Sequence, residues 1–228
     1  MVHVKNFYFN DFRECCSVIW DETGECVIVD PGCGTEPEKA SLYGFISGKD
    51  LKPVKILLTH AHFDHILGLA DCAGKYGIPV YMHPAEKETL ENNGYFAKAF
   101  GFEMPATDIR TTDIADGDMI RFGNTEFEVI STPGHTPGGV CYLDSKDRLL
   151  LSGDTLFAGT IGRTDQPGGD YDRLMESIFS RLMCLDGDID VIPGHGPKTS
   201  IAEERVKNPF LQPFNLPEDD EESDDAEE

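Results

Sequence analysis

Four short segments of the sequence place histidine or aspartate directly after a run of apolar residues. They are Thr59–His65, Pro133–His135, Ser152–Asp154 and Pro193–His195. Five of the seven histidines lie in these segments. Where helices flank a sheet, the loops at one end of the strands converge, so side chains from distant parts of the chain can meet in one crevice. The pattern predicts a single polar site.

The candidate metal ligands are seven imidazole and carboxylate side chains: His60, His62, Asp64, His65, His135, Asp154 and His195. Imidazole nitrogens favour zinc and similar divalent ions, and seven ligands are too many for one tetrahedral ion. We therefore expect two ions, held by two groups of residues: His60, His62 and His135, and Asp64, His65 and His195. Asp154 is expected to bridge the ions, and Asp64 and Asp154 are the expected catalytic carboxylates.

The chemistry that such a pair of ions predicts is hydrolysis. Two ions about 3.5–4 Å apart can hold and ionise a water molecule and can polarise a carbonyl or phosphoryl oxygen. The pKa of the water falls toward roughly 7 under these conditions. We expect two zinc ions, with iron or manganese as alternatives in one or both positions.

The motif H-x-H-x-D-H at His60–His65, with the later His, Asp and His, resembles the metallo-β-lactamase superfamily. The matching motifs span Asp30 to His195, and Ile28–Gly32 fits the strand and turn that precede the metal motif in that family. The resemblance implies the α/β class, with an αββα four-layer sandwich. The segment Gly159–Asp165 further resembles the glyoxalase II-like thioesterases, in particular their short single-domain type.

That closer resemblance implies a small-molecule thioester substrate, such as an S-2-hydroxyacylglutathione. Arg163 is the candidate for binding a substrate carboxylate, and pairing with Asp165 or Asp170 is the other interpretation of this side chain. Full-length glyoxalase II proteins carry a C-terminal helical domain whose basic residues help to hold glutathione, but only 33 residues follow His195 here. The remaining candidates for that contact are Lys198, Arg205 and Lys207.

Two other functions stay open at this point. The persulfide dioxygenases are also similar around Gly162–Asp165 and use one iron held by two His and one Asp. The residues that could take this role are His60, His135 and Asp154. The third possibility is a protein without enzymatic activity whose acidic end, Glu218–Glu228, binds a basic partner.

The elements that must position these residues follow from the hydrophobic pattern. Strands are expected over 2–9, 15–20, 26–29, 54–58, 79–82, 119–122, 126–130, 139–143, 148–151 and 189–192. Helices are expected over 36–48, 66–76, 84–100, 172–184 and 201–207, and a loop over 107–118. Asp30 is expected to form structural hydrogen bonds at a strand end rather than to bind metal.

Length and composition limit the remaining questions. The chain has 228 residues, of which 39% are hydrophobic, enough to form the core of one domain. We expect a hydrolase domain over 1–208 and a disordered, acidic tail that contains several prolines over 209–228. The net charge is −23, and it is still −14 without the nine acidic residues of Glu218–Glu228, which argues against a nucleic-acid partner.

The sequence has no apolar run long enough to span a membrane and no disulfide pattern among its seven cysteines. We therefore expect a cytoplasmic protein that does not bind membranes. The oligomeric state is left undetermined.

Overall fold

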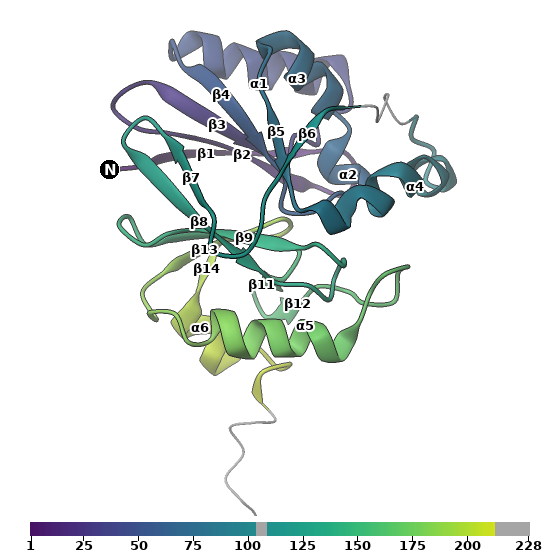
Figure 1. Ribbon diagram of the computed structural model, residues 1–228, viewed down its shortest axis with the longest axis vertical. Coiled ribbons are helices and arrows are strands. Elements are labelled where there is room, and N and C mark those ends of the chain that lie inside the picture. Colours follow the sequence, from purple (N-terminus) through teal and green to yellow (C-terminus); the bar gives the residue numbers. More distant parts are fainter. Residues whose placement is uncertain (104–108, 213–228) are drawn as a thin grey trace, which may run out of the picture.

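Two mixed β-sheets lie face to face in the middle of the molecule, and helices cover the outer face of each sheet (Figure 1). The computed structural model describes residues 1–103 and 109–212. Apolar side chains from both sheets, among them Ile19, Val27, Phe127 and Tyr142, form one buried cluster between them. This arrangement confirms the predicted αββα sandwich.

The first sheet contains six strands in the order in which they occur in the chain. They are β1 (His3–Phe9), β2 (Glu14–Trp20), β3 (Glu25–Val29), β4 (Lys52–Leu57), β5 (Val80–Met82) and β6 (Thr111–Asp113). The first three pair antiparallel as a meander, and β3 to β6 are parallel. Two helices pack on the outer face: α1 (Glu36–Gly48) and α3 (Leu69–Tyr76). A capping box between Thr35 and Glu38 starts α1 where the sequence predicts it.

The second sheet has the strand order β14-β13-β10-β9-β8-β7. Its strands are β7 (Met119–Phe122), β8 (Thr125–Ser131), β9 (Val140–Asp144), β10 (Leu149–Gly153), β13 (Asp190–Pro193) and β14 (Thr199–Ser200). The outer face is covered by α5 (Tyr171–Ser177), a π-helical turn η2 (Ile178–Leu182) and α6 (Ile201–Lys207). A small hairpin, β11 (Leu156–Phe157) and β12 (Thr160–Ile161), follows β10.

The helix predicted over 66–76 is wrong as one unit, because the chain forms α2 (Phe63–Ile66) and then α3. Gly68 lies between the two helices, and its backbone N–H donates to the carbonyl of Pro31. A Cβ at this position would collide with the Cys33 side chain, so the break depends on glycine. The break lets Asp64 and His65 form a helical turn of their own beside the site.

The segment predicted as a loop over 107–118 contains the short strand β6, which pairs parallel to β5 at the edge of the first sheet. Residues 107 and 108 lie outside the described residues. Edge strands this short carry too few residues for a period-2 pattern, which explains why the prediction was wrong here. The helix predicted over 84–100 is η1 (Pro84–Glu86) followed by α4 (Lys87–Ala99), and that predicted over 172–184 ends as η2.

The C-terminal end of the described chain packs against the second sheet. Leu211 is buried in the cluster under α5, three residues beyond the domain limit predicted at 208. Residues 213–228, which hold most of the predicted tail, lie outside the described residues, so the division into domain and tail stays a prediction.

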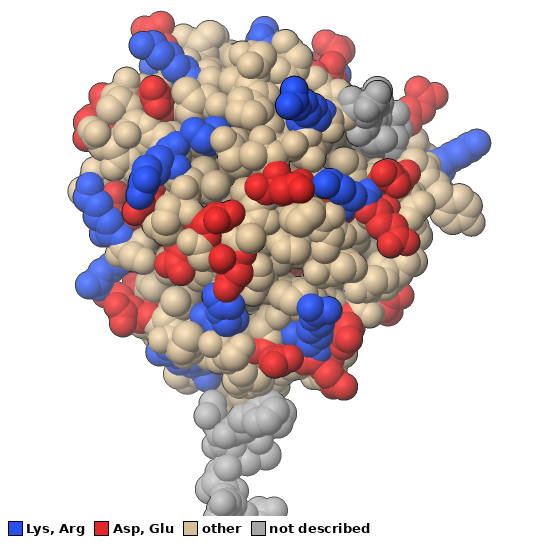
Figure 2. All heavy atoms as spheres, in the orientation of Figure 1, with Lys and Arg blue, Asp and Glu red and all other residues tan. Residues whose placement is uncertain are grey.

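The described surface and the cysteines relate to the expectations about membranes and free thiols. Figure 2 shows one face of the molecule, on which Lys and Arg side chains alternate with Asp and Glu. Among the described residues, no helix has the length and apolar character that a membrane crossing requires. Six of the seven cysteines are buried, as expected for thiols that serve as small core residues. The exception is Cys184, which is exposed.

Candidate metal centre

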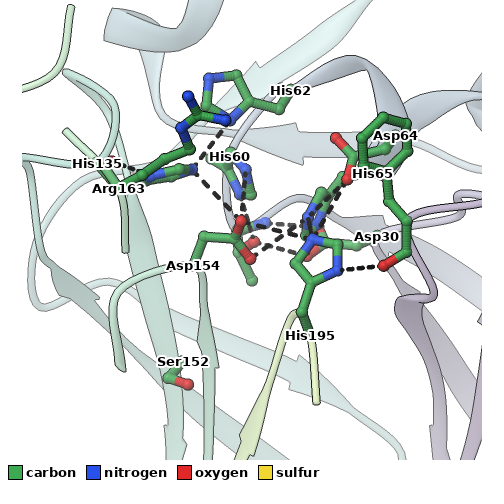
Figure 3. Close-up of polar contacts among 12 residues, drawn as sticks. Asp30, His60, His62, Asp64, His65, His135, Ser152, Asp154, Arg163 and His195 are labelled. Carbon is green, nitrogen blue, oxygen red and sulfur yellow. Dashed lines mark hydrogen bonds and ion pairs between the residues drawn. The ribbon is translucent and has the colours of Figure 1, made fainter. Parts of the chain in front are cut away.

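All seven predicted ligands meet at one edge of the sandwich, in the loops that follow four strands (Figure 3). The segment with His60 and His62 follows β4 of the first sheet, whereas His135, Asp154 and His195 follow β8, β10 and β13 of the second. Because β10 and β13 run parallel, Asp154 and His195 emerge at the same end. A Cβ at Gly194 would collide with the Asp154 carboxylate, which explains the glycine before His195.

The first group, which we call group 1, consists of His60, His62 and His135. One ring nitrogen of each lies within 4.8 Å of the others. His135 Nε2 and His62 Nδ1 are 2.9 Å apart. Two nitrogens that share a tetrahedral zinc ion are separated by about 3.3 Å, since each lies roughly 2.0–2.1 Å from the metal. The observed separation is slightly shorter than this value, so only a small shift would let the two rings share one ion.

The second group, group 2, consists of Asp64, His65 and His195, whose ligand atoms also lie within 4.8 Å of one another. His65 Nε2 is 3.2 Å from His195 Nε2. Asp64 Oδ2 is 3.3 Å from the same nitrogen of His195. Group 2 therefore differs from group 1 in that a carboxylate belongs to it.

Asp154 lies between the two groups, as Figure 3 shows. Its Oδ2 is 3.4 Å from His135 Nε2 of group 1 and 3.6 Å from His195 Nε2 of group 2. Its Oδ1 is 3.4 Å from His65 Nε2. A carboxylate with both groups in reach is suited to bridge two cations.

Two buried polar atoms in this cluster have no hydrogen-bond partner among the described residues. They are His60 Nε2 and Asp154 Oδ1, and the latter has the 3.4 Å contact with His65 Nε2 but no hydrogen bond. Unpartnered buried polar atoms are costly and usually satisfied by water or an ion. Since the surrounding donors are imidazoles and carboxylates, the residues fit divalent ions such as zinc or iron.

Hydrogen bonds to the far side of the rings orient the ligating nitrogens. His135 Nδ1 donates to the carbonyl of Arg163 at 2.7 Å, and His195 Nδ1 donates to that of Phe12 at 3.0 Å. A proton on Nδ1 leaves the lone pair of Nε2 directed at the cluster. Burial also lowers the pKa of His62 to about 3 and that of His60 well below its usual value, so both rings are unprotonated at neutral pH.

Asp30 supports group 2. Its Oδ2 accepts from His65 Nδ1 at 3.1 Å, and the carboxylate also accepts from the Thr59 amide and hydroxyl. Because the Thr59 hydroxyl donates to Asp30, its oxygen can accept from His60 Nδ1, which lies 3.1 Å away. Asp30 thus makes the structural hydrogen bonds expected of it, and in doing so orients a candidate ligand.

Glu86 supports group 1 and was not predicted from the sequence. Its buried carboxylate accepts from the backbone N–H of Ala61 at 2.8 Å and from that of Gly138 at 2.7 Å, so one side chain ties the His60–His62 loop to the His135 loop. The Asn93 amide donates to the Ala61 carbonyl from the same side. Helical periodicity could have indicated that Glu86 and Asn93 are buried. At helical spacing, both lie on the same face as the buried Leu90 and Ala97.

A strand of the first sheet holds the His195 loop. Glu14 on β2 forms an isolated antiparallel bridge with His195, and the Cys15 amide donates to the carbonyl of Gly194 at 2.8 Å. The Glu14 carboxyl is fully buried, and burial raises its pKa well above the usual value. The two sheets are therefore joined directly beneath group 2.

An open cavity of about 490 Å³ lies over the cluster. Arg163 lines it, and its guanidinium pairs with Asp165 through two hydrogen bonds of 2.7 and 2.8 Å. This pair holds the pKa of Asp165 at about 2. The internal pairing considered for Arg163 is thus present, and its contact with a substrate stays a prediction.

Comparisons with known proteins agree with this geometry. A model described as the metallo-beta-lactamase superfamily matches residues 12–196. The probable metallo-hydrolase YqgX of Bacillus subtilis (strain 168) is 41% identical over 194 residues, covering 84% of this chain and 90% of that protein. The hydroxyacylglutathione hydrolase GloC of Haemophilus influenzae is 35% identical over 204 residues, covering 88% of this chain and 93% of GloC.

Two solved structures share both the fold and detectable sequence similarity. The BLEG-1 B3 metallo-beta-lactamase superimposes with a TM-score of 0.84 at 36% identity, over 92% of this chain and 99% of that one. TTHA1623, solved in a di-iron-bound form, superimposes with a TM-score of 0.81 at 36% identity, over 91% of this chain and 100% of that one.

Proposed function

Because the chain belongs to the metallo-beta-lactamase superfamily, we propose that its centre binds two metal ions and hydrolyses small thioesters, such as an S-2-hydroxyacylglutathione. The observation that carries the proposal is the position of Asp154 between two complete ligand groups at the floor of a cavity. The similarity to GloC supports the thioester class, and the similarity to YqgX supports the broader class of metal-dependent hydrolases.

The residues that would hold the ions are those of group 1 and group 2, with Asp154 shared between them. When bound, such ions lower the pKa of a water molecule and polarise the substrate carbonyl. We propose zinc as the metal, and the di-iron form of TTHA1623 supports iron as the alternative.

The protein's own groups account for the placement and charge of the reactants. Burial raises the pKa of Asp64, but the neighbouring His65 and His195 rings outweigh that effect, so the pKa lies below its usual value and this carboxylate is ionised at neutral pH. It faces the cavity and can accept a hydrogen bond from the attacking water. Addition of water to the carbonyl and cleavage of the C–S bond then yield a carboxylate and a thiol.

The second candidate function for the same residues is that of a persulfide dioxygenase with one iron ion. The dioxygenase would hold its iron with His60, His135 and Asp154. Asp154 Oδ2 lies 3.9 Å from His60 Nε2 and 3.4 Å from His135 Nε2. That chemistry does not require group 2, yet group 2 is complete and supported by Asp30. The presence of group 2 thus supports the proposed hydrolase, while a dioxygenase that retains these residues remains the alternative to be tested.

The test is elemental analysis of the purified protein together with thioester and persulfide assays. We expect two metal ions per chain and hydrolysis of S-D-lactoylglutathione without oxygen uptake. One iron per chain with oxygen uptake on a persulfide would establish the dioxygenase instead. Metal-loaded protein that cleaves no thioester would contradict the proposal.

A further inference from the structure

The cavity over the metal centre continues into a second one. The second cavity has a volume of about 360 Å³, and the two share His62, Phe63 and Gln166 as lining residues. The larger one is lined by ligands from both groups, namely His62, His135, Asp64 and His195, whereas the smaller one is lined by only His62 among them. We call them the inner lobe and the outer lobe. A thioester has two arms that meet at the reacting carbonyl, so a cleft with two lobes suits it.

Aromatic rings form one wall of the inner lobe. Phe12, Phe63 and Phe100 contact one another, with ring centroids 5.4 to 5.7 Å apart. Phe100 is 56% exposed and Phe12 is 38% exposed, although both rings are apolar and lie beside a polar centre. Phe157 lines the same lobe and contacts the His195 ring. Exposed apolar surface in a cleft marks the place where an apolar ligand is bound.

The described residues that line the two lobes supply little positive charge. Arg163 is the one Lys or Arg side chain among them; it lines the inner lobe only, and its Nε and Nη2 groups donate to the Asp165 carboxylate. The outer lobe is lined by neutral polar groups such as Thr89 and Asn92, together with the carboxylate of Glu88. A thiol arm with free carboxylates would lose hydration there and gain no cationic partner.

Resting on the proposed thioesterase function, we propose that the preferred substrate has an apolar, aromatic acyl group and an uncharged, amide-bearing thiol. The acyl group lies against Phe12 and Phe100 in the inner lobe. The thiol arm passes between His62 and Gln166 into the outer lobe, where side-chain amides and hydroxyls can bond its amide groups. Glutathione thioesters are then cleaved, but more slowly than thioesters of an uncharged thiol, because the two carboxylates of glutathione lack a cationic partner in the outer lobe.

Four thioesters separate the two parts of this proposal: the lactoyl and phenylacetyl esters of glutathione and of N-acetylcysteamine. We expect kcat/KM to rise at least about tenfold from lactoylglutathione to phenylacetyl-N-acetylcysteamine, with contributions from both changes. Preference for lactoylglutathione would overturn this inference and leave the thioesterase function intact. Cleavage of none of the four by metal-loaded protein would overturn both.

Phe100→Ala tests the aromatic wall. We expect it to weaken binding of a stable analogue, S-phenethyl-N-acetylcysteamine, by about 5- to 10-fold in calorimetry, because one ring face is lost. The matched control is Tyr171→Ala, which removes a half-exposed ring from α5 outside both lobes. Unchanged binding in Phe100→Ala would overturn the placement of the acyl group.

Asn92→Lys tests the outer lobe by adding the missing cation. We expect kcat/KM for phenylacetylglutathione to rise about 3- to 10-fold, while that for phenylacetyl-N-acetylcysteamine stays within twofold. Ser41→Lys on α1, an exposed position outside both lobes, is the control for net charge and should change neither value. Equal effects of Asn92→Lys on both thioesters would overturn the assignment of the thiol arm to this lobe.

Discussion

Group 1 and group 2 of the metal centre are held in place by different means. In group 1 all three candidate ligands are imidazoles, and the buried Glu86 fixes their loops through backbone N–H groups. In group 2 Asp64 is itself a candidate ligand, and the Asp30 carboxylate accepts directly from the His65 ring. Negative charge therefore supports group 1 through the backbone and group 2 through the ligands.

The comparison separates two kinds of contribution to a metal site. A carboxylate that contacts a ligating ring raises the basicity of that ring and fixes its tautomer. A carboxylate that accepts from backbone amides fixes the distance between loops instead. The two groups should accordingly respond differently when their supporting carboxylates are removed.

The largest effect is expected from Asp154, the residue that the two groups share. Asp154→Ala should lower kcat on a thioester by on the order of 10³-fold or more, because both groups lose a carboxylate. Metal content should fall in both groups while the circular dichroism spectrum is retained. Asp188→Asn, an exposed carboxylate paired with Arg148, is the control. Unchanged turnover in Asp154→Ala would exclude a bridging role.

Single-ligand variants should then separate the two groups. His62→Ala and His195→Ala are each expected to remove about one metal equivalent per chain, since each leaves only two ligands in its own group. Metal analysis after dialysis measures this. Loss of both equivalents in each variant would show that the groups bind cooperatively rather than as two sites.

A smaller effect is expected from Asp30→Asn, which keeps the shape of the side chain and removes its charge. We expect metal affinity in group 2 to fall about 10- to 100-fold, because the direct partner of His65 Nδ1 is weakened. The loss in group 1 should be smaller, because Asp30 reaches His60 only through the Thr59 hydroxyl. Competition with a chelator would resolve the two affinities. A larger loss from group 1 would contradict the assignment of Asp30 to group 2.

The smallest effect is expected from Glu86→Gln, which leaves one carbonyl oxygen to serve two backbone donors. The free energy of unfolding should fall by about 1–3 kcal/mol, because one of the two backbone donors loses its acceptor. The metal affinity of group 1 should also fall, but by a smaller factor than the metal affinity of group 2 falls in Asp30→Asn. Denaturation curves and chelator competition are the measurements. Glu88→Gln on α4, an exposed carboxylate nearby, should leave both quantities unchanged.

Much of the site was predictable because its residues are close in sequence or follow recognisable strands. The spacing of His60, His62, Asp64 and His65 brings four candidate ligands into one loop, and the strands before Asp154 and His195 have clear apolar patterns. Glu86 escaped prediction because its partners, Ala61 and Gly138, lie 25 and 52 residues away. Backbone N–H groups are present at every residue except proline and leave no sequence signal.

The sequence by itself determined most strands and helices and the set of ligand types, since hydrophobic period and residue chemistry are local properties. The αββα class followed from the resemblance of the motifs between Asp30 and His195 to the metallo-β-lactamase superfamily. Tertiary structure decided which carboxylates support which ligands, because that depends on how the two sheets meet beneath His195 and around Ala61. It also decided the break at Gly68 and the two lobes of the cleft, which arise from close approaches between segments far apart in the chain. Contacts of this kind exist only after packing brings the segments together.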